Sequence, residues 1–395
     1  MNGVEVLPAS GSSAATGPDV EVSVVIPCLN EEAAIEEVVR AARSGLEAAR
    51  VAGEVVVVDN ASEDRSAELA RAAGAVVVYE PRRGYGSAYL AGLSAARGRF
   101  AVMADADGTY PLELIPAFVE KLRGGADMVI GSRFKGTIHP GAMPWPNRYI
   151  GNPILTGMLN LLFRSGVSDA HCGLRAIRRD VLPSLKLSAT GMEFASEMVI
   201  KAGKRRLRVE EIPIDYRPRI GDSKLSRVGD AWRHVRFMLV HSPTFLFSVP
   251  GGFATLAGLV ALLVLACMPQ LGDPWTGVSV AFAMLAIVGV GVIQLGLFSR
   301  TYAVVYLGES DRWLERGWRR LRLEHGLAIS AVVLVMGLGI TAGSLFDGVK
   351  DPRLGILGLA LMAIALQAIF AAFFLSILGL SEHAILRRRG GGTRG

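Results

Sequence analysis

The sequence contains little cysteine and little charge. Its 395 residues include only three cysteines, at positions 28, 172 and 267, and no two of them have CxxC spacing. This excludes a disulfide-rich secreted scaffold and indicates reduced thiols that face a cytosol. Charged residues make up 20% and hydrophobic residues 51% of the chain, whereas about 25% of the residues of an average soluble protein are charged. Intrinsic disorder and a purely cytosolic enzyme are therefore excluded.

Signature motifs of several protein classes are absent as well. The sequence has no Walker A loop and no Gly-x-Ser-x-Gly element, which removes support for an ATPase or an α/β-hydrolase. The six histidines lack metal-ligand spacing, and we interpret them as structural. Residues 1–20 have neither the basic nor the apolar segment of a signal peptide, so a disordered tail is expected there.

The net charge of +6 is unevenly distributed. Arginines cluster beside apolar stretches in the C-terminal half, which is typical of the cytoplasmic loops of membrane proteins. They are not interleaved with aromatic residues, as they are in platforms that stack nucleic-acid bases. We therefore expect a lipid bilayer, and no nucleic acid, among the partners.

Apolar and amphipathic segments alternate in the first hundred residues. Buried strands are predicted at the apolar runs 22–27, 54–60, 75–80 and 99–107. Such alternation is typical of an α/β fold, in which a mainly parallel sheet carries helices on both faces. Ligands bind beyond the carboxyl ends of these strands, and all four runs end in polar residues. The sequence thus predicts a binding site at that edge of the sheet.

Four apolar stretches follow, each long enough to cross a bilayer, which takes roughly 20 residues. They lie near residues 244–268, 276–299, 326–346 and 354–380. We expect an all-α transmembrane domain of four helices at residues 244–382, an interfacial amphipathic helix at 226–243 and a basic tail at 383–395. Arginines gather before the first stretch, between the second and third, and after the fourth. The positive-inside rule therefore predicts that the soluble domain and both termini are cytoplasmic. The protein is thus expected to be a multi-pass protein of the cell membrane.

The segment Asp105-Ala106-Asp107 directly ends the fourth predicted strand. Two carboxylates at positions i and i+2 of a turning backbone can converge on one divalent cation. Mg²⁺ and Mn²⁺ prefer oxygen ligands and accept phosphate oxygens in the same shell. Most such tripeptides are surface turns, but the placement after a buried strand favours a metal site at Asp105 and Asp107.

Other polar residues at the predicted edge suit a phosphorylated ligand. Asp59 can accept hydrogen bonds from a base or ribose, or else cap the helix that follows it. Near Arg83 and Gly84 the chain offers a cation and a close backbone approach to phosphate. Basic residues further along suit phosphate groups on both sides of a transfer reaction, namely Arg133, Arg219 and Lys224. For Lys224, simple attraction to lipid headgroups is an equally good interpretation.

Seven segments in a fixed order carry a resemblance to a known family: VVIPCLNEE, VVVVDNASED, RRGYGSAYLAG, DADGTYP, GSRF, CGLRAIRRD and IGDSK. Over residues 20–240 the chain resembles a family 2 glycosyltransferase. More narrowly, it resembles the polyprenyl-phosphate branch, which includes synthases of dolichol-phosphate mannose and glucose. The resemblance implies a Rossmann-like GT-A fold for residues 21–225 and the use of a nucleotide-sugar with Mg²⁺ or Mn²⁺.

The resemblance and the strand-end pattern together define an expected site. The residues expected to bind the nucleotide-sugar are Pro27, Leu29, Asn30, Glu31, Asp59, Arg83, Gly84, Asp105 and Ala106. The residues expected to act in catalysis are Asp107, Arg133, Arg219 and Lys224. The chain departs from the family at Leu29, where a tyrosine is frequent, and at Thr109, where related chains often carry a glutamine beside the metal.

The implied activity is that of an inverting, metal-dependent hexosyltransferase. It would move a sugar from a donor of the UDP-glucose or GDP-mannose type to polyprenyl phosphate. A phosphate monoester has a second pKa of about 6, so this acceptor needs no general base. We expect Glu193 and Glu197 to support basic side chains instead.

Two other interpretations stay open. One is a processive polysaccharide synthase, although the QxxRW element of such enzymes is incomplete at Arg312-Trp313. The other is a non-catalytic flippase of lipid-linked sugars or a nucleotide sensor. The sequence leaves open the sugar, the nucleotide, the lipid length and whether the protein forms a homo-oligomer.

Overall fold

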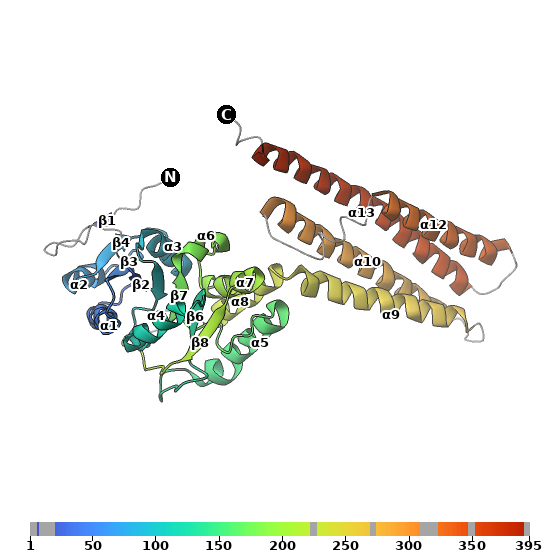
Figure 1. Ribbon diagram of the computed structural model, residues 1–395. Coiled ribbons are helices and arrows are strands. Elements are labelled where there is room, and N and C mark those ends of the chain that lie inside the picture. The colour runs from blue at the N-terminus through green and yellow to red at the C-terminus, as the bar shows by residue number, and fades with distance from the viewer. Residues whose placement is uncertain are drawn as a thin grey trace. The chain divides into compact units, whose positions relative to one another are not determined.

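The structure is a computed structural model, and it describes residues 6–7, 20–221, 227–268, 274–307, 323–346 and 352–390. The chain divides into two compact units, Met1–Met238 and Leu239–Gly395. The first unit holds the sheet and the second holds the long apolar helices (Figure 1). The division falls inside the segment 226–243, which the sequence predicts to be an interfacial helix.

An eight-stranded sheet forms the centre of the first unit, in the order β1-β4-β3-β2-β5-β7-β6-β8. The strands are β1 (Val6–Leu7), β2 (Val22–Cys28), β3 (Gly53–Asp59), β4 (Val76–Tyr79), β5 (Phe100–Met103), β6 (Met128–Ser132), β7 (Arg175–Arg178) and β8 (Val209–Pro213). Strands β4, β3, β2 and β5 are mutually parallel, and β8 is parallel to β6. Strand β7 runs antiparallel to both of its neighbours. The predicted mainly parallel sheet is confirmed.

The structure differs from the prediction at the N-terminal tail. Within residues 1–20, Val6 and Leu7 form strand β1, which pairs antiparallel with Val78 and Val77 of β4. Strand β4 would otherwise be an edge strand, whose free backbone groups readily accept a passing chain. The rest of the predicted tail up to residue 19 lies outside the residues that the structure describes.

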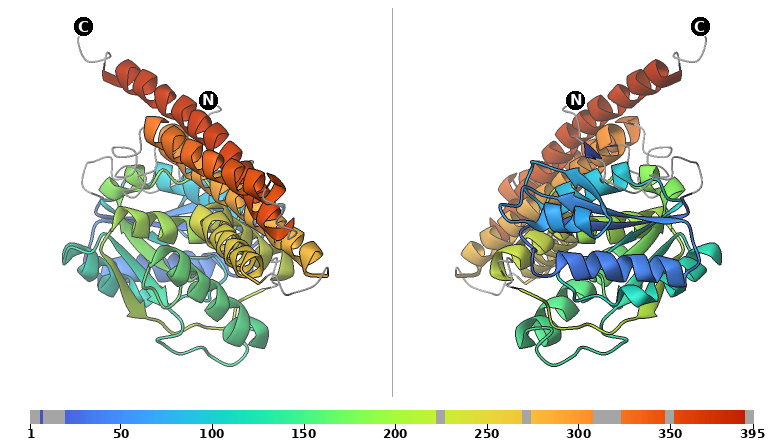
Figure 2. Two further views of the ribbon diagram at one scale, coloured as in Figure 1. Left: turned by 90° about the vertical axis from the view of Figure 1, so that its right-hand side faces the viewer. Right: turned by 90° about the vertical axis from the view of Figure 1, so that its left-hand side faces the viewer.

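Helices cover both faces of the sheet (Figure 2). They are α1 (Ile35–Ala48), α2 (Ser66–Ala72), α3 (Tyr85–Ala95), α4 (Ile115–Arg123), α5 (Asn152–Phe163), α6 (Leu182–Leu185), α7 (Phe194–Arg205) and α8 (Arg227–Val240). Short helical turns are η1 (Leu112–Leu114), η2 (Asn147–Gly151) and η3 (Arg179–Val181). Helix α1 packs against α4, and α3 packs against α7. The valines of β2 and β3 are buried between these layers, which explains their unbroken apolar runs.

The second unit consists of η4 (Thr244–Ser248), α9 (Val249–Ala266), α10 (Pro274–Leu307), α12 (Leu323–Phe346) and α13 (Pro352–Gly390). Its helices give four stretches that are long and apolar enough to span a membrane, and their positions match the predicted spans: Thr244–Ala266, Pro274–Val305, Leu323–Leu345 and Pro352–Leu378. Helix α13 continues to Gly390, so part of the predicted tail at 383–395 prolongs the last helix.

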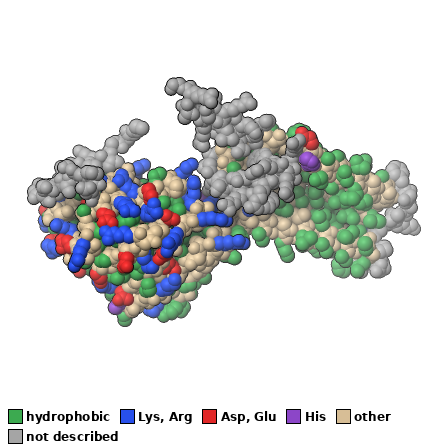
Figure 3. Space-filling view, viewed as in Figure 1, with side chains coloured by type: hydrophobic (Ala, Val, Ile, Leu, Met, Phe, Trp, Pro, Cys, Tyr) green, Lys and Arg blue, Asp and Glu red, His purple; other side chains and the backbone are tan. Residues whose placement is uncertain are grey.

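The surfaces of the two units differ in chemistry. On the face shown in Figure 3, charged side chains are scattered over the first unit, while hydrophobic side chains cover the second. Large side chains such as Phe253, which is 76% exposed, point outward from the second unit. An apolar surface of this kind is stable only in contact with lipid or protein. It supports the assignment of these helices as membrane spans.

Candidate active site

The predicted strand ends meet at one edge of the sheet. In the parallel pairing of β2 with β3, Cys28 stands opposite Asp59, and in the pairing of β3 with β4, Asp59 stands opposite Tyr79. Strand β5 pairs with β2 as far as Met103, so Asp105 follows just beyond the same edge. The structure thus gathers the polar ends of all four predicted strands.

The loop after β2 is fastened to the loop after β3 by side chains. The Asn30 amide donates to Ser62 Oγ at 3.0 Å, and the Glu63 amide donates to Asn30 Oδ1 at 2.7 Å. The Glu31 amide donates to Ser66 Oγ at 2.8 Å. Asn30 also has a positive φ of 51°, a conformation that asparagine tolerates better than most residues. Its position therefore has a structural reason besides the predicted contact with a donor.

Asp59 lies at the end of β3 and holds the turn that follows this strand. Its side chain is 7% exposed, and Oδ1 accepts a hydrogen bond from the Ser62 amide at 3.1 Å. This contact closes the turn that follows β3, but it does not cap a helix as predicted, because α2 begins only at Ser66 with Arg65 at its N-cap position. No hydrogen bond or ion pair to Oδ2 is found among the described residues.

Asn60, which sequence reasoning missed, organises the neighbouring loop. Its Nδ2 donates to the carbonyl oxygens of Glu80 at 2.9 Å and Arg82 at 2.8 Å, and its Oδ1 accepts from the Gly84 amide at 2.7 Å. The only feature of the sequence that could have pointed to Asn60 is its position directly after Asp59. Asn60 therefore fixes the start of α3 relative to the end of β3.

Gly84 has a steric requirement for glycine. Its φ is 151°, and a Cβ there would lie 2.3 Å from the carbonyl oxygen of Thr190. Arg83 instead points outward, where it pairs with Glu63 at 2.5 Å. The loop at residues 82–86 thus packs closely against the loop at 189–190, and only part of it faces the strand-end site.

Asp105 lies among aromatic hydroxyls. Its Oδ1 accepts a hydrogen bond from Tyr85 at 2.9 Å and lies 3.4 Å from the Tyr89 hydroxyl. Gly173 approaches from the other side, where a Cβ would lie 2.7 Å from Oδ2. Burial and the negative charge of Asp107 raise the pKa of Asp105 to about 6. A cation placed between the two carboxylates would relieve this repulsion.

Asp107 is held by a residue where the chain departs from the family. Thr109 donates to Asp107 Oδ1 from its hydroxyl at 2.6 Å and from its amide at 3.1 Å. On the other oxygen, Arg219 Nη2 lies 3.1 Å from Oδ2, and the same nitrogen lies 3.8 Å from Glu31 Oε1. Thr109 therefore orients the carboxylate of Asp107, to which it donates from both its hydroxyl and its amide.

The chemistry of these groups fits a divalent cation held mainly by non-protein oxygens. Asp105 and Asp107 supply hard oxygen ligands on one edge. Within the described part of the chain, no cluster of three or more His, Cys, Asp or Glu side chains is arranged to hold a metal. A cation here would therefore complete its shell with phosphate oxygens and water, as Mg²⁺ commonly does.

Arg133 is paired internally. Its Nε and Nη2 donate to the two carboxylate oxygens of Asp169 at 2.7 and 2.8 Å, and both side chains are buried. The guanidinium also lies 5.2 Å from the ring centre of Tyr216. Asp169 was not predicted, because it lies 36 positions along the chain from Arg133.

The remaining predicted site residues are distributed as follows. Pro27 and Leu29 are half-buried at the end of β2, and Ala106 is buried between the two aspartates. Lys224 lies outside the residues that the structure describes. Glu197, expected to support a basic side chain, pairs with Lys201 at 2.6 Å and accepts hydrogen bonds from the Ser188 and Ala189 amides.

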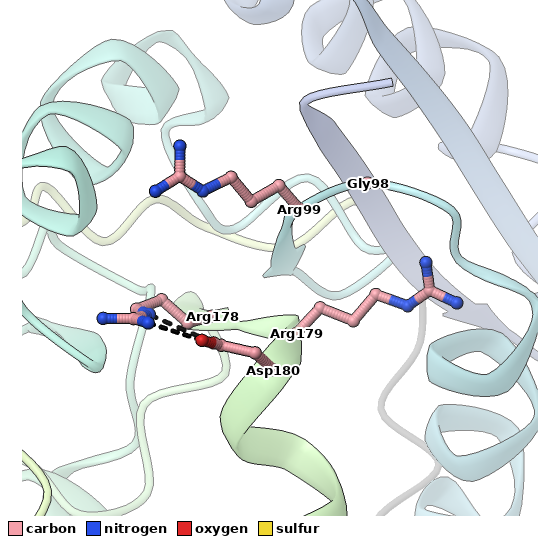
Figure 4. A pocket seen from close by; sticks show the side chains of 5 residues that line it. All are labelled: Gly98, Arg99, Arg178, Arg179 and Asp180. Carbon is pink, nitrogen blue, oxygen red and sulfur yellow. Dashed lines mark hydrogen bonds and ion pairs between the residues drawn. The ribbon is translucent and has the colours of Figure 1, made fainter. Parts of the chain in front are cut away.

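A surface cavity of about 460 Å³ lies at the opposite edge of the sheet (Figure 4). It is lined by Gly98, Arg99, Arg178, Arg179 and Asp180. Phe100 at the start of β5 pairs with Arg178, so the cavity opens at the amino end of β5, away from Asp105. Arg178 pairs with Asp180 there and lowers the pKa of that carboxyl. This cavity is separate from the strand-end site.

Comparison with known proteins identifies the family. Residues 23–185 match the family described as glycosyl transferase family 2, and residues 297–379 match the C-terminal transmembrane region of family 2 glycosyltransferases. The first match covers the strands from β2 to β7 with Asp59, Asp105 and Asp107, and the second lies in the apolar helices.

Three glycosyltransferases are similar to this chain over half of its length or more. The low-salt glycan biosynthesis hexosyltransferase Agl6 of Haloferax volcanii is 39% identical over 370 residues, which cover 91% of this chain and 89% of that protein. The dolichyl-phosphate hexose transferase of the same organism is 36% identical, over 52% of this chain and 86% of that protein. The undecaprenyl-phosphate 4-deoxy-4-formamido-L-arabinose transferase of Pseudomonas paraeruginosa is 33% identical, over 72% of this chain and 86% of that protein.

The match to Agl6 includes residues of both units, the one with the sheet and the one with the apolar helices. The mainly parallel sheet with carboxylates at its strand ends agrees with the GT-A fold that the sequence predicts. A soluble GT-A unit followed by four apolar helices describes a membrane enzyme that transfers sugars. The chain therefore belongs to glycosyltransferase family 2, as one of its membrane-bound members.

Proposed function

We propose that this protein transfers a hexose from a nucleoside-diphosphate sugar to a polyprenyl phosphate. The observation that carries the proposal is the pair of carboxylates, Asp105 and Asp107, with Arg219 beside them at the edge of a family 2 sheet. The names of the relatives support a polyprenyl phosphate as the acceptor, since two of these names contain dolichyl phosphate or undecaprenyl phosphate.

Asp105 and Asp107 are the residues that would hold a Mg²⁺ or Mn²⁺ ion. When bound, the ion would neutralise charge on the donor diphosphate. Asp59 would accept hydrogen bonds from the base or ribose through its second oxygen. We place Pro27, Leu29 and Ala106 in the wall of the donor site because they are half-buried or buried at the same edge.

Arg219 is the basic residue best placed to act on the phosphates. Its Nη2 already lies against Asp107, and its Nε is buried with no hydrogen-bond partner among the residues that the structure describes. A donor diphosphate would provide that partner. The guanidinium would then stabilise the charge that develops on the departing nucleoside diphosphate. Arg133, which is paired with Asp169, would act mainly by shaping the site.

The acceptor phosphate would attack the anomeric carbon opposite the leaving group. The bond from that carbon to the acceptor oxygen forms as the bond to the diphosphate oxygen breaks, and the nucleoside diphosphate leaves with the electron pair. Because the acceptor is already anionic, no side chain needs to remove a proton. Catalysis would rest on positioning and on charge stabilisation, and the configuration would be inverted.

The membrane unit would keep the site near lipid headgroups. With the first unit and both termini on the cytoplasmic side, the site would lie in the compartment that supplies nucleotide-sugars. Confinement to the surface raises the effective concentration of a lipid acceptor.

The test is transfer of radiolabelled sugar in membranes that contain the full-length protein. Polyprenyl phosphate is supplied with a panel of UDP- and GDP-sugars, with Mn²⁺ or with a chelator. We expect label in the organic phase that depends on metal and disappears in Asp107→Asn. Asp180→Asn, a surface change at the opposite edge, is the matched control. Label that needs neither the metal nor Asp107 would contradict the proposal.

A further inference from the structure

A chain of three polar side chains, two of them buried and His171 half-buried, joins α8 to the loop before β7. Ser196 Oγ on α7 lies 3.0 Å from His171 Nε2 in this loop and 2.8 Å from His234 Nδ1 on α8. The two imidazole rings also meet edge to face, with their centres 4.6 Å apart. Ser196 is fully buried, and His234 is only 7% exposed.

The hydrogen bonds have one favoured direction. The Nδ1 atom of His171 is buried and has no hydrogen-bond partner in the described part of the chain. An unpaired donor at this position would cost more than an unpaired acceptor. The proton of His171 therefore belongs on Nε2, which donates to Ser196, and Ser196 in turn donates to His234 Nδ1. Burial and the nearby His234, Arg175 and Arg133 hold the pKa of His171 well below its usual range. The imidazole thus stays neutral, and the direction is kept.

The loop that His171 belongs to forms one wall of the active site. It carries Asp169, the partner of buried Arg133, and Gly173, which packs against Asp105. Arg175 holds the same loop through the carbonyl oxygens of Ala170 and Cys172. A shift of the loop would therefore move both a basic and an acidic group of the site.

The first turn of α7 supports a second wall as well. Glu197, next to Ser196, holds the amides of Ser188 and Ala189. The adjoining Thr190 carbonyl accepts a hydrogen bond from the Ser87 amide and lies against Gly84. The start of α7 is thus in contact with two loops of the site and with α8.

We propose that His171, Ser196 and His234 are positioning residues that fix the loop at 169–173 to α8, the helix that precedes the first membrane span in the chain. Through this link, the seating of α8 sets the position of Arg133 and of the wall beside Asp105. The inference rests on the proposed function for its effect on catalysis. The link itself is independent of the reaction.

Isosteric substitutions give a specific test. The amide of asparagine reaches the position of histidine Nδ1, and that of glutamine reaches the position of Nε2. His171→Gln and His234→Asn therefore keep the link, whereas His171→Asn, His234→Gln and Ser196→Ala break it. All five are made in the full-length protein, and thermal unfolding confirms that each variant is folded.

Two measurements are made on every variant. Hydrogen exchange of residues 167–174 should become about tenfold faster in the link-breaking variants, which corresponds to the loss of one hydrogen bond, while α1 stays unchanged. Sugar transfer should show a lower kcat, again by about tenfold, at an unchanged KM for the donor. The link-preserving variants should stay within about twofold of the native protein in both measurements.

Equal behaviour of Gln and Asn at the same histidine, in exchange and in kcat, would overturn the proposal, because an ordinary core histidine has no preference between the two. If the native protein transfers no sugar to polyprenyl phosphate, the proposed function fails. The exchange pattern of the loop then still decides whether the link exists.

Discussion

Arg219 Nη2 lies 3.1 Å from Asp107 Oδ2, so a candidate metal ligand is already paired with a cation from the chain. A divalent ion would compete with Arg219 for this carboxylate. Binding of the ion and release of the guanidinium toward the donor phosphates would therefore be linked.

The first prediction concerns this competition. In Arg219→Gln, the Mn²⁺ concentration that gives half-maximal transfer should fall, because Asp107 has lost its competing cation. At the same time kcat should fall by about 100-fold or more, the usual effect of losing one group that stabilises the transition state. Titration of transfer activity with Mn²⁺ measures both. Arg217→Gln, which removes an exposed pair with Glu113, is the control and should change neither.

A second prediction concerns the buried pair of Arg133 and Asp169. Asp169→Asn leaves an uncompensated guanidinium in the core and should cost about 3–5 kcal/mol in the stability of the first unit. Native-state hydrogen exchange at β6 in the full-length protein measures the loss. Asp180→Asn removes an exposed ion pair, which contributes at most about 1 kcal/mol. Similar losses in the two variants would contradict the assignment.

The raised pKa of Asp105 predicts a dependence of stability on pH in metal-free protein. The folded state binds this proton more tightly than the unfolded state, so the resulting stabilisation is complete below the unfolded pKa of about 3.9 and is lost as the pH rises. The loss is complete above the folded pKa of about 6. Asp105→Asn should therefore unfold at a higher temperature than the native protein near neutral pH, and the advantage should vanish in acid.

Added Mn²⁺ provides the control for this prediction. The ion should stabilise the native protein and not Asp105→Asn. The difference between their unfolding temperatures should therefore shrink or change sign. Asp180, whose pKa is lowered, should show the opposite pH dependence, because its contribution to stability is lost as the pH falls. An advantage of Asp105→Asn that grows in acid would show that the carboxyl is not repelled by its neighbour.

Gly84→Ala tests the close packing of two loops at the site. The substitution combines a positive φ with a contact of 2.3 Å to the Thr190 oxygen, and it should cost about 1–3 kcal/mol. Gly157 lies inside α5, where a Cβ would meet nothing within 4 Å. Alanine there should instead stabilise the helix by about 0.5–1 kcal/mol. Chemical denaturation of the two variants in parallel checks the difference in sign.

Local patterns were sufficient to predict much of this architecture. The apolar runs of β2, β3 and β5 predicted buried parallel strands, and the place of Asp105 and Asp107 after such a run predicted a shared edge. Four long apolar stretches predicted the four apolar helices that are long enough to span a membrane. Each of these signals lies within one segment of the chain, where side-chain periodicity directly reflects burial.

Contacts between distant segments could not be predicted in this way. Asp169 neutralises Arg133, Arg219 reaches Asp107, and Asn60 fastens the loop before α3, yet none of these pairs has a local spacing that marks it. The structural interpretation of the histidines also missed that His171 and His234 meet through Ser196. Such pairs depend on the order of strands in the sheet, which short-range patterns do not encode.

The reversed direction of β7 has a consequence for how such a site can vary. A parallel strand offers the segment that follows it to the carboxyl edge, whereas β7 offers the segment that precedes it, with Asp169 and Gly173. The long excursion between β6 and β7, which includes α5, therefore starts and ends at the same edge. Its last residues, Asp169 and Gly173, contact Arg133 and Asp105, so a change in this segment would also alter the site. The segment between β6 and β7 therefore connects variation outside the sheet to the geometry of the site.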